Sequence, residues 1–266
     1  MASPRSDVWA PNPRQQSLLE EVRARGAVSV ERLAQRLDVT MQTVRRDIQR
    51  LSEAGLLARF HGGVSLPAVT QRSAGPELAW HERQALKAEA KARIARSVAA
   101  AVPDGARLML GIGTTVEAVA HALAHKRDLH VITHSLHVAL ALAHHPDCTV
   151  EVPGGRLRTR DSALEGETTE QSLRDVEADI VIVSAVGMDV QGQLMDRDER
   201  ELPVLQAMLD RAREHWLVVD ASKFHQTPPT QGAHLKQMHR VFTEALPPAP
   251  LPALMQSLGV GLTIAS

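Results

Sequence analysis

The chain has 266 residues, of which 44% are hydrophobic and 23% charged, and its formal net charge is −1. This length and composition predict one or two domains with a sizeable core and exclude a largely disordered chain. The single cysteine, Cys148, excludes a disulfide framework and a cysteine-rich zinc site, and an aromatic content of 2% argues against a stacking platform for single-stranded nucleic acid. No apolar run approaches the roughly 18 residues of a membrane span, and residues 1–13 lack a signal-peptide pattern. We therefore expect a cytoplasmic protein without a membrane partner.

The first quarter of the chain predicts a disordered tail followed by three helices and a hairpin. Residues 1–13 hold three prolines that disfavour a helix, so they are the expected tail. Ser29 and Thr40 are the expected N-caps of the second and third helices. The helical patterns cover residues 14–25, 29–37 and 40–55, and two short strands, residues 56–60 and 64–66, surround a Gly-Gly turn. Together these elements predict a winged helix-turn-helix domain over residues 14–67.

The rest of the chain predicts a linker and an α/β domain. Residues 68–76 form the expected linker, because this stretch is rich in proline, glycine and small polar residues. Residues 77–101 predict one long helix. Short apolar runs then alternate with helical patterns, which is typical of a largely parallel sheet in a domain over residues 77–266. The expected strands are residues 108–112, 129–133, 149–152, 180–185, 216–219 and 240–243.

The third helix predicts a surface for reading duplex DNA. Its core stripe leaves outward-facing side chains that can bond base edges and phosphates, namely Gln42, Thr43, Arg45, Arg46, Gln49 and Arg50. The hairpin adds a second candidate contact with the DNA backbone or minor groove through Arg59, His61, Gly62 and Gly63. The alternative is that these residues form an ordinary solvated face of a small helical domain.

The charge distribution favours DNA binding, although the whole chain is nearly neutral. Residues 12–67 hold nine arginines and six acidic residues, a net charge of +3. Residues 68–266 hold 20 basic and 24 acidic residues, a net charge of −4. The chain is therefore a basic head on an acidic body.

Specific motifs in both domains resemble the DeoR/GlpR family of bacterial transcriptional regulators. In the head these are residues 28–34 (VSVERLA), 37–40 (LDVT), 43–48 (TVRRDI), 51, 55–57 (GLL), 59 and 61–63 (HGG). In the body they are residues 82–83 (ER), 104–105 (DG), 113–115 (GTT), 131–136 (VITHSL), 154–157 (GGRL), 164–166 (LEG), 201 and 220–224 (DASKF). The resemblance covers roughly residues 14–243.

The resemblance implies a transcriptional regulator, more often a repressor than an activator, that binds operator DNA. It also implies that a phosphorylated sugar or a related metabolite modulates this binding, and that the body is related in fold to sugar-phosphate isomerases. The chain departs from the family pattern at Gly111, where an aspartate is frequent, and at His134, where an asparagine is usual. Both positions lie where a ligand would be read. The imidazole of His134 could bind an effector in a pH-sensitive way, or it could simply reflect drift at a tolerant position.

Several loops of the body offer the residue types that bind a phosphorylated effector. A glycine-rich turn with hydroxyls at a helix start suits an anion, and ligands in α/β sheets gather at the carboxyl ends of the strands. The candidate residues in the loops after the first three strands are Gly111, Gly113, Thr114, Thr115, Thr133, His134, Ser135, Gly154 and Gly155. Three further candidates for the effector site lie later in the chain, namely Asp189, Glu201 and Lys223. Asp189 would bind sugar hydroxyls, and Lys223 would pair with a phosphate or with Glu201. Arg156, Arg158 and Arg160 are candidate counter-charges.

Two other readings stay open at this point. Asp189, Glu201 and Lys223 supply the residue types of a sugar-phosphate isomerase, but no motif joins them into a reactive set. An activator of the same architecture is the second alternative. No cofactor is expected. No metal site is expected either, because most of the 13 histidines are scattered, the adjacent pair His144 and His145 does not have a common metal-ligand spacing, and the chain has one cysteine. Helix-turn-helix proteins usually bind DNA as dimers, so we expect a homo-oligomer, a dimer or a tetramer.

Overall fold

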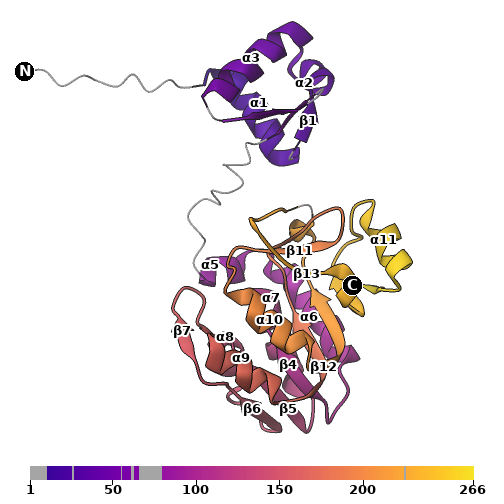
Figure 1. The fold of residues 1–266 in the computed structure, drawn as a ribbon. Coiled ribbons are helices and arrows are strands. Elements are labelled where there is room, and N and C mark those ends of the chain that lie inside the picture. Colours follow the sequence, from indigo (N-terminus) through magenta and orange to yellow (C-terminus); the bar gives the residue numbers. More distant parts are fainter. Residues whose placement is uncertain (1–10, 26, 55, 61–62, 66–79, 225) are drawn as a thin grey trace, which may run out of the picture. The chain divides into compact units, whose positions relative to one another are not determined.

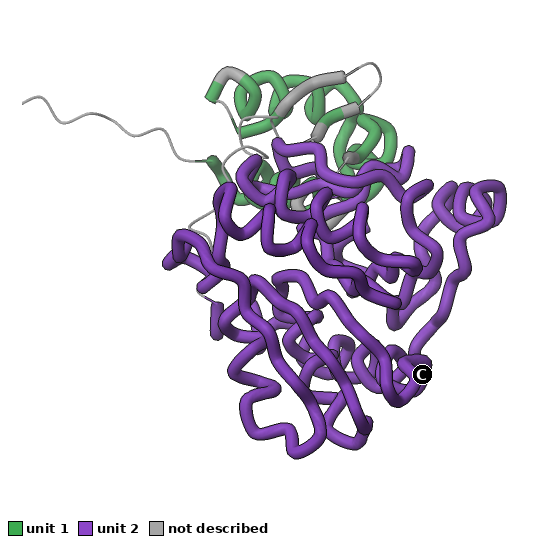
Figure 2. The backbone as a smooth tube through the Cα atoms, turned by 60° about the horizontal axis from the view of Figure 1, so that its bottom comes forward, with its two compact units in different colours: residues 1–76 green, residues 77–266 purple. Residues whose placement is uncertain are grey.

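The computed structural model describes residues 11–25, 27–54, 56–60, 63–65, 80–224 and 226–266. The chain divides into two compact units, residues 1–76 and residues 77–266, which Figure 2 distinguishes by colour. Most of the predicted tail and all of the predicted linker, residues 68–76, lie outside the described residues. Each unit has its own core and is described by itself.

The N-terminal unit packs three helices against a small antiparallel sheet (Figure 1). The helices are α1 (Pro13–Arg25), α2 (Val30–Leu37) and α3 (Met41–Glu53). The strands are β1 (Ala27–Ser29), β2 (Ala58–Phe60) and β3 (Gly63–Ser65), in the order β1-β3-β2. Leucine and valine side chains from all three helices, such as Leu18, Leu33 and Leu51, form the core. Strand β1 has three residues, too few for the alternation that predicts a strand from sequence.

The predicted N-caps of α2 and α3 are confirmed. The Ser29 hydroxyl accepts a hydrogen bond from Arg32 N at 3.3 Å, and the Thr40 hydroxyl accepts one from Thr43 N at 3.3 Å. The expectation that Pro13 prevents a helix is wrong, because α1 begins at this residue. Proline is favoured in the first turn of a helix, where its missing N–H has no intrahelical partner to lose.

The C-terminal unit is built on a seven-stranded sheet in which every neighbouring pair is parallel, so the predicted α/β class is confirmed. Its strands are β4 (Arg107–Leu110), β5 (Leu129–Thr133), β6 (Cys148–Glu151), β9 (Ala178–Val183), β12 (Ala212–Val218), β14 (Arg240–Thr243) and β15 (Gly261–Ile264). The strand order is β15-β14-β12-β9-β4-β5-β6. The chain first builds the sheet outward from β4 to β6 and then outward from β9 to β15. The direction therefore reverses between β4 and β9.

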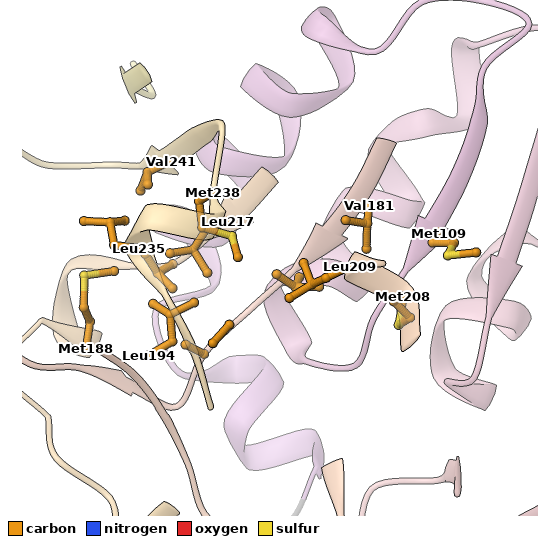
Figure 3. Packing of buried hydrophobic residues seen from close by; sticks show 14 of the residues in the cluster. Met109, Val181, Met188, Leu194, Met208, Leu209, Leu217, Leu235, Met238 and Val241 are labelled. Atoms are coloured by element: carbon orange, nitrogen blue, oxygen red, sulfur yellow. The ribbon is translucent and has the colours of Figure 1, made fainter. Parts of the chain in front are cut away.

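Helices cover both faces of this sheet, and alternate strand residues feed two separate cores. One core joins residues such as Leu108 and Ile182 to α6 (Ala88–Ala101), α7 (Thr114–Ala122) and α8 (Leu136–Leu142). The other joins residues such as Met109 and Val181 to α9 (Glu167–Arg174), α10 (Glu201–Leu209) and α11 (Leu251–Leu258), and Figure 3 shows part of it. Strands buried on both faces explain the continuous apolar runs of the sequence.

The predicted single helix over residues 77–101 is wrong. Within the described part of this stretch, α5 (Trp80–Ala85) ends at a turn and α6 begins at Ala88. Lys87 lies between them in the left-handed region, with φ of 57°. The side chain of Trp80 is buried, and this anchoring competes with continuation into one straight helix.

Several short strands and turns complete the unit. The hairpin β7 (Arg156–Arg158) and β8 (Ala163–Glu165) follows the sheet strand β6. A small antiparallel sheet holds β10 (Gly187–Met188), β11 (Gln193–Asp196) and β13 (Thr230–His234). Three 3-10 turns are η1 (Leu123–His125), η2 (Ala221–Lys223) and η3 (Leu235–Gln237).

Among the described residues, no helix has the length and apolar character to cross a bilayer, and no group of three metal-ligating side chains is found.

Candidate functional site

Helix α3 presents a polar outer face opposite its buried stripe. Val44, Ile48 and Leu51 are buried in the core of the N-terminal unit. The predicted reading residues Gln42, Arg45, Arg46, Gln49 and Arg50 are all exposed, while Thr43 is partly buried beside the cap. Donors and acceptors thus line one side of a helix of the size that enters a major groove.

Asp47 holds this helix against α1. Its carboxylate accepts hydrogen bonds from Arg14 Nε at 2.6 Å and from Gln15 Nε2 at 3.0 Å, and the residue is 2% exposed. Burial alone would raise the pKa of Asp47, but the bonds from Arg14 and Gln15 hold it below its ordinary value. Asp47 therefore orients the outer face without belonging to it. The motif carried Asp47, yet its structural role was not predicted.

The hairpin candidates are only partly described. Gly63 begins β3, and the backbone of Arg59 lies in β2, paired with Val64. His61 and Gly62 lie outside the described residues.

A pocket opens in the C-terminal unit where the order of the parallel strands reverses. Its cavity has a volume of about 110 Å³. The loop after β4 supplies Gly113, the start of α7 supplies Thr114 and Thr115, and the loop after β9 supplies Ser184. Ligands of open α/β sheets bind at such a reversal because the two loops diverge there and leave a crevice. Gly113 has φ of 126°, and a Cβ at this position would lie 3.2 Å from the Ser184 Cβ, so the close approach of the loops requires glycine.

Two lysines give the pocket an unbalanced positive charge. Lys91 of α6 and Lys223 of η2 both line it, and Asp220 lies beside them. Burial lowers the pKa of both lysines; the carboxylate of Asp220 opposes that shift for both, and the carboxylate of Glu117 opposes it for Lys91. The described lining as a whole holds more cations than carboxylates, and this excess favours a ligand that brings negative charge. The cations are Arg83, Lys91, Arg158, Arg160, Arg197 and Lys223, and the carboxylates are Asp161, Asp196 and Asp220. Lys223 was predicted from the sequence, whereas Lys91 lies in a helical pattern that gave no signal.

The carboxyl group of Asp196 also lines the pocket. Burial raises its pKa to about 6, assisted by the negative charge of Glu201, although backbone N–H groups of Arg197 and Asp198 bind the carboxylate. The pocket thus pairs a cationic region with a carboxylate able to accept hydrogen bonds from hydroxyl groups. Asp196 and Arg197, like Ser184, Trp80 and Arg83, were not predicted to lie in the site.

Arg158 carries a charge that the protein itself neutralises. Its guanidinium binds both carboxylate oxygens of Asp161 at 2.8 and 3.0 Å and also binds Glu165 and Glu201. Burial alone would lower the pKa of Arg158, but the hydrogen bond and charge of Asp161 and the charge of Glu201 raise it further above neutrality. Arg158 and Asp161 reach the pocket as one ion-paired group. Arg160 also lines the pocket and lies 3.6 Å from Asp198, whereas Arg156 pairs with Glu165 and is largely exposed.

Several predicted effector residues do not line this pocket. Thr133 and Ser135 are buried and bond to each other and to the start of α8. His134 bonds one carboxylate oxygen of Glu201 at 2.9 Å and Arg158 binds the other, so both oxygens have partners other than the predicted Lys223. Gly111 is packed against β9, and the carbonyl of Gly154 accepts a hydrogen bond from Thr169 at 2.8 Å.

Two further predicted residues also have structural positions. Gly155 lies against the Thr169 hydroxyl. Asp189 accepts backbone hydrogen bonds from Gln191 and Gln193, both at 2.9 Å, and so closes the turn before β11. Residues 133–135 and 154–155, which lie at or shortly after the ends of β5 and β6, do not line the pocket, whereas Arg158, Arg160 and Asp161, farther along the segment after β6, do.

Comparison with known proteins gives both units a family. Residues 14–70 match the DeoR-like helix-turn-helix domain, and residues 86–245 match the DeoR C-terminal sensor domain. The chain belongs to the DeoR family. It is 39% identical over 92% of both chains to the HTH-type transcriptional repressor CsqR of Escherichia coli (strain K12). It is 37% identical over 88% of this chain and 91% of the relative to the glycerol-3-phosphate regulon repressor of the same organism.

Among solved structures, the chain is similar to ribose 5-phosphate isomerase A from Neisseria gonorrhoeae. The TM-score is 0.38 at 17% sequence identity, with 50% of this chain and 52% of the isomerase covered. The two family matches place the exposed face of α3 in the helix-turn-helix domain of this DeoR-family protein. They place all of the pocket except Trp80 and Arg83 in its sensor domain.

Proposed function

We propose that this DeoR-family protein is a transcriptional repressor whose α3 enters the major groove of operator DNA. The exposed face of α3, with Gln42, Arg45, Arg46, Gln49 and Arg50, supports base and phosphate contacts. Asp47 supports the same proposal, because it fixes the helix from behind and leaves that face clear. The relatives named as repressors favour repression over activation.

The effector in this proposal is a small anion, in the first place a phosphorylated metabolite, bound in the pocket at the strand reversal. The observation that carries it is the pair Lys91 and Lys223, two partly desolvated ammonium groups in a pocket whose described lining holds more cations than carboxylates. Thr114, Thr115 and the start of α7 add hydroxyls and backbone N–H groups suited to phosphate oxygens. A relative named for the glycerol-3-phosphate regulon points to the same ligand class.

The pocket supports binding rather than turnover. Isomerisation needs a carboxylate placed to take a proton, and a cation to stabilise the enediolate. Glu201 is engaged by Arg158 and His134, and Asp189 closes a turn, so two of the three residues considered for that chemistry have structural roles. Turnover of pentose or hexose phosphates by the purified protein would contradict this part of the proposal.

We also propose a homodimer that presents two copies of α3 in the cytoplasm to one face of the DNA. Helix-turn-helix dimers read half-sites whose centres lie about 34–36 Å apart. Sedimentation of the protein with and without DNA tests this stoichiometry. A monomer on each isolated half-site would contradict it.

Separate variants of the two units test the assignment. Lys223→Ala and Thr114→Val should keep DNA affinity but lose the response to phosphorylated ligands. Arg46→Ala should weaken DNA binding but keep the increase in melting temperature that a ligand of the folded state produces. If Lys223→Ala abolishes DNA binding while the ligand response survives, the roles of the two units are reversed.

A further inference from the structure

Helix α5 connects the pocket to the predicted linker along the chain. It begins at Trp80, four residues after the end of the predicted linker, and its residues lie outside both family matches. Trp80, Arg83 and Leu86 nevertheless line the pocket. We call residues 80–86 the strap. The strap is thus one wall of the pocket and the first described segment of the C-terminal unit.

A single buried side chain anchors the strap. Trp80 is 9% exposed, whereas Leu86 is 50% exposed and the residues between them are exposed or partly buried. A six-residue helix has little stability of its own, because its few hydrogen bonds do not offset the cost of nucleation. Segments with few buried apolar contacts also open locally at a low free-energy cost. The docked position of the strap therefore depends on what Trp80 touches and on what fills the pocket.

The partners of the anchor lie on α7 and α8. The indole Nε1 of Trp80 donates a hydrogen bond to Glu117 at 2.9 Å, and the Gln84 amide donates one to the same carboxylate at 3.1 Å. The Trp80 ring stacks on His137, with ring centroids 4.1 Å apart and an interplanar angle of 4°. Glu117 is 7% exposed and lies on α7, whose first residues, Thr114 and Thr115, line the pocket. The strap and the hydroxyls of the anion site are therefore attached to the same helix.

Two cations couple the strap to the pocket. The Lys91 ammonium donates a hydrogen bond to the backbone carbonyl of Arg83, and the Arg83 guanidinium lies 4.9 Å from the centre of the Trp80 ring. Both cations line the pocket, so an anion bound there attracts groups that touch the strap. A ligand that binds more tightly when the strap is docked shifts the equilibrium between the docked and the undocked strap toward the docked state.

We propose that the strap transmits occupancy of the pocket to the DNA-binding unit: an anion held by Arg83 and Lys91 stabilises the docked strap, and loss of the anion releases it. Docking fixes the point at which the linker enters the C-terminal unit, and so restricts how the two DNA-binding units of a dimer reach their half-sites. The inference rests on the proposed function, because it requires an anionic effector in this pocket.

Hydrogen exchange on the full-length protein tests strap docking directly. The probes are inorganic phosphate and glycerol 3-phosphate, each at a concentration that raises the melting temperature of the wild type but not of Lys223→Ala. We expect exchange of the amides of residues 80–86 to slow at least about fivefold with such a probe. Unchanged exchange with a bound probe overturns the strap proposal and leaves the effector site standing. If neither probe raises the melting temperature, the assigned ligand class fails, and the strap proposal fails with it.

Variants of the anchor test transmission. Glu117→Gln removes the carboxylate charge at nearly constant shape, Trp80→Phe removes the indole N–H and keeps a ring, and His81→Ala changes an exposed strap residue as the control. DNA affinity is measured with and without the probe on a duplex selected from random sequence by the wild type. Glu117→Gln, whose side chain does not line the pocket, should bind ligand-free DNA within about twofold of wild type, and in both anchor variants the ligand-dependent change in affinity should shrink at least about fivefold. His81→Ala should respond as the wild type does.

Circular dichroism and melting temperature establish that each variant is folded, and either anchor variant suffices for the comparison. A full ligand response in a folded Glu117→Gln or Trp80→Phe that binds the probe overturns the proposal. A wild type that selects no duplex contradicts the proposed function instead, and the exchange measurement still decides the docking of the strap.

Discussion

Arg158 and Glu201 form a buried ion pair between the β7-β8 hairpin and helix α10, with 2.5 Å between Arg158 Nη2 and Glu201 Oε2. The two side chains are 4% and 8% exposed. Burial alone would raise the pKa of Glu201, but its bonds to His134 and Arg158 hold the pKa below its ordinary value. The pair keeps the hairpin in place, and the hairpin supplies Asp161 and Arg160 to the wall of the pocket.

We predict that Arg158→Met severely destabilises the C-terminal unit. The substitution retains much of the side-chain volume but leaves the buried carboxylates of Asp161 and Glu201 without their cation. Breaking a buried pair from one side typically costs about 3–5 kcal/mol. Urea unfolding followed by circular dichroism measures the loss.

Arg174→Met is the matched control, because Arg174 forms an ion pair with Glu170 at 3.5 Å on an exposed face of α9. Its expected cost is below about 0.5 kcal/mol. Equal free energies of unfolding for the two variants would contradict a structural role for the Arg158 network.

We predict that Asp196→Asn stabilises the protein at neutral pH and weakens recognition of the effector. The folded pKa of Asp196, raised mainly by burial to about 6 from an ordinary value of 3.8, means that the folded state binds this proton more tightly than the unfolded chain. The stabilising contribution is complete below pH 3.8 and is lost as the pH rises through about 6. An asparagine removes this penalty and still accepts the hydrogen bonds from Arg197 and Asp198.

The expected gain from Asp196→Asn is about 1–2 kcal/mol at pH 7.5, after allowance for partial exposure, and it should vanish near pH 4. Thermal unfolding of both proteins across this range measures it. A gain of the same size at both pH values would mean that the carboxylate charge is not its source.

Sequence periodicity predicted the parallel sheet because each central strand is buried on both faces. Leu108 and Leu110 lie in one core and Met109 lies in the other. The resulting continuous apolar run distinguishes such a strand from one with a single buried face. The hairpin β7-β8 has the sequence RLR followed by ALE, where charged side chains make ion pairs instead of an apolar face. The break at Lys87 was also hidden, because lysine gives no sequence signal for a left-handed backbone.

The site was only half predictable, because strand order is not a local property. Gly113, Thr114 and Thr115 were found from a glycine-rich turn after a strand, and they line the pocket. Thr133 and Gly154 have the same local pattern but follow β5 and β6, which do not border the reversal between β4 and β9. Ser184 lines the pocket because β9 lies next to β4, a pairing that brings together residues about 70 positions apart. Packing of the whole sheet, and not any short motif, decides which of these loops meet.

We predict that Gly155→Ala destabilises the protein and leaves the intrinsic ligand affinity of the folded fraction unchanged. Gly155 has φ of 148°, and a Cβ would overlap the Thr169 hydroxyl and lie 3.0 Å from the Glu165 carbonyl. Overpacking of this kind costs about 1–3 kcal/mol. Thermal unfolding gives the loss, and titration below the melting temperature gives the affinity.

Gly166→Ala is the control for backbone strain without overlap, since φ is 100° there and a Cβ would meet nothing within 4 Å. Its cost should therefore be smaller than that of Gly155→Ala. A large loss of ligand affinity in folded Gly155→Ala would return the 154–155 loop to the effector site.

We predict that Arg46→Ala lowers specific DNA affinity by about 1–3 kcal/mol if its guanidinium reads a base. The side chain is exposed on α3, so the substitution should leave the melting temperature of the free protein nearly unchanged. Fluorescence anisotropy on the selected duplex and on random-sequence DNA, each over a range of salt concentrations, separates two modes of contact. A base contact predicts loss on the selected duplex only. A phosphate contact predicts equal loss on both and a salt slope smaller by about 1. Arg174→Ala, the same loss of charge in the other unit, is the control, and an Arg46→Ala protein that binds both duplexes as tightly as this control would remove Arg46 from the DNA-binding face.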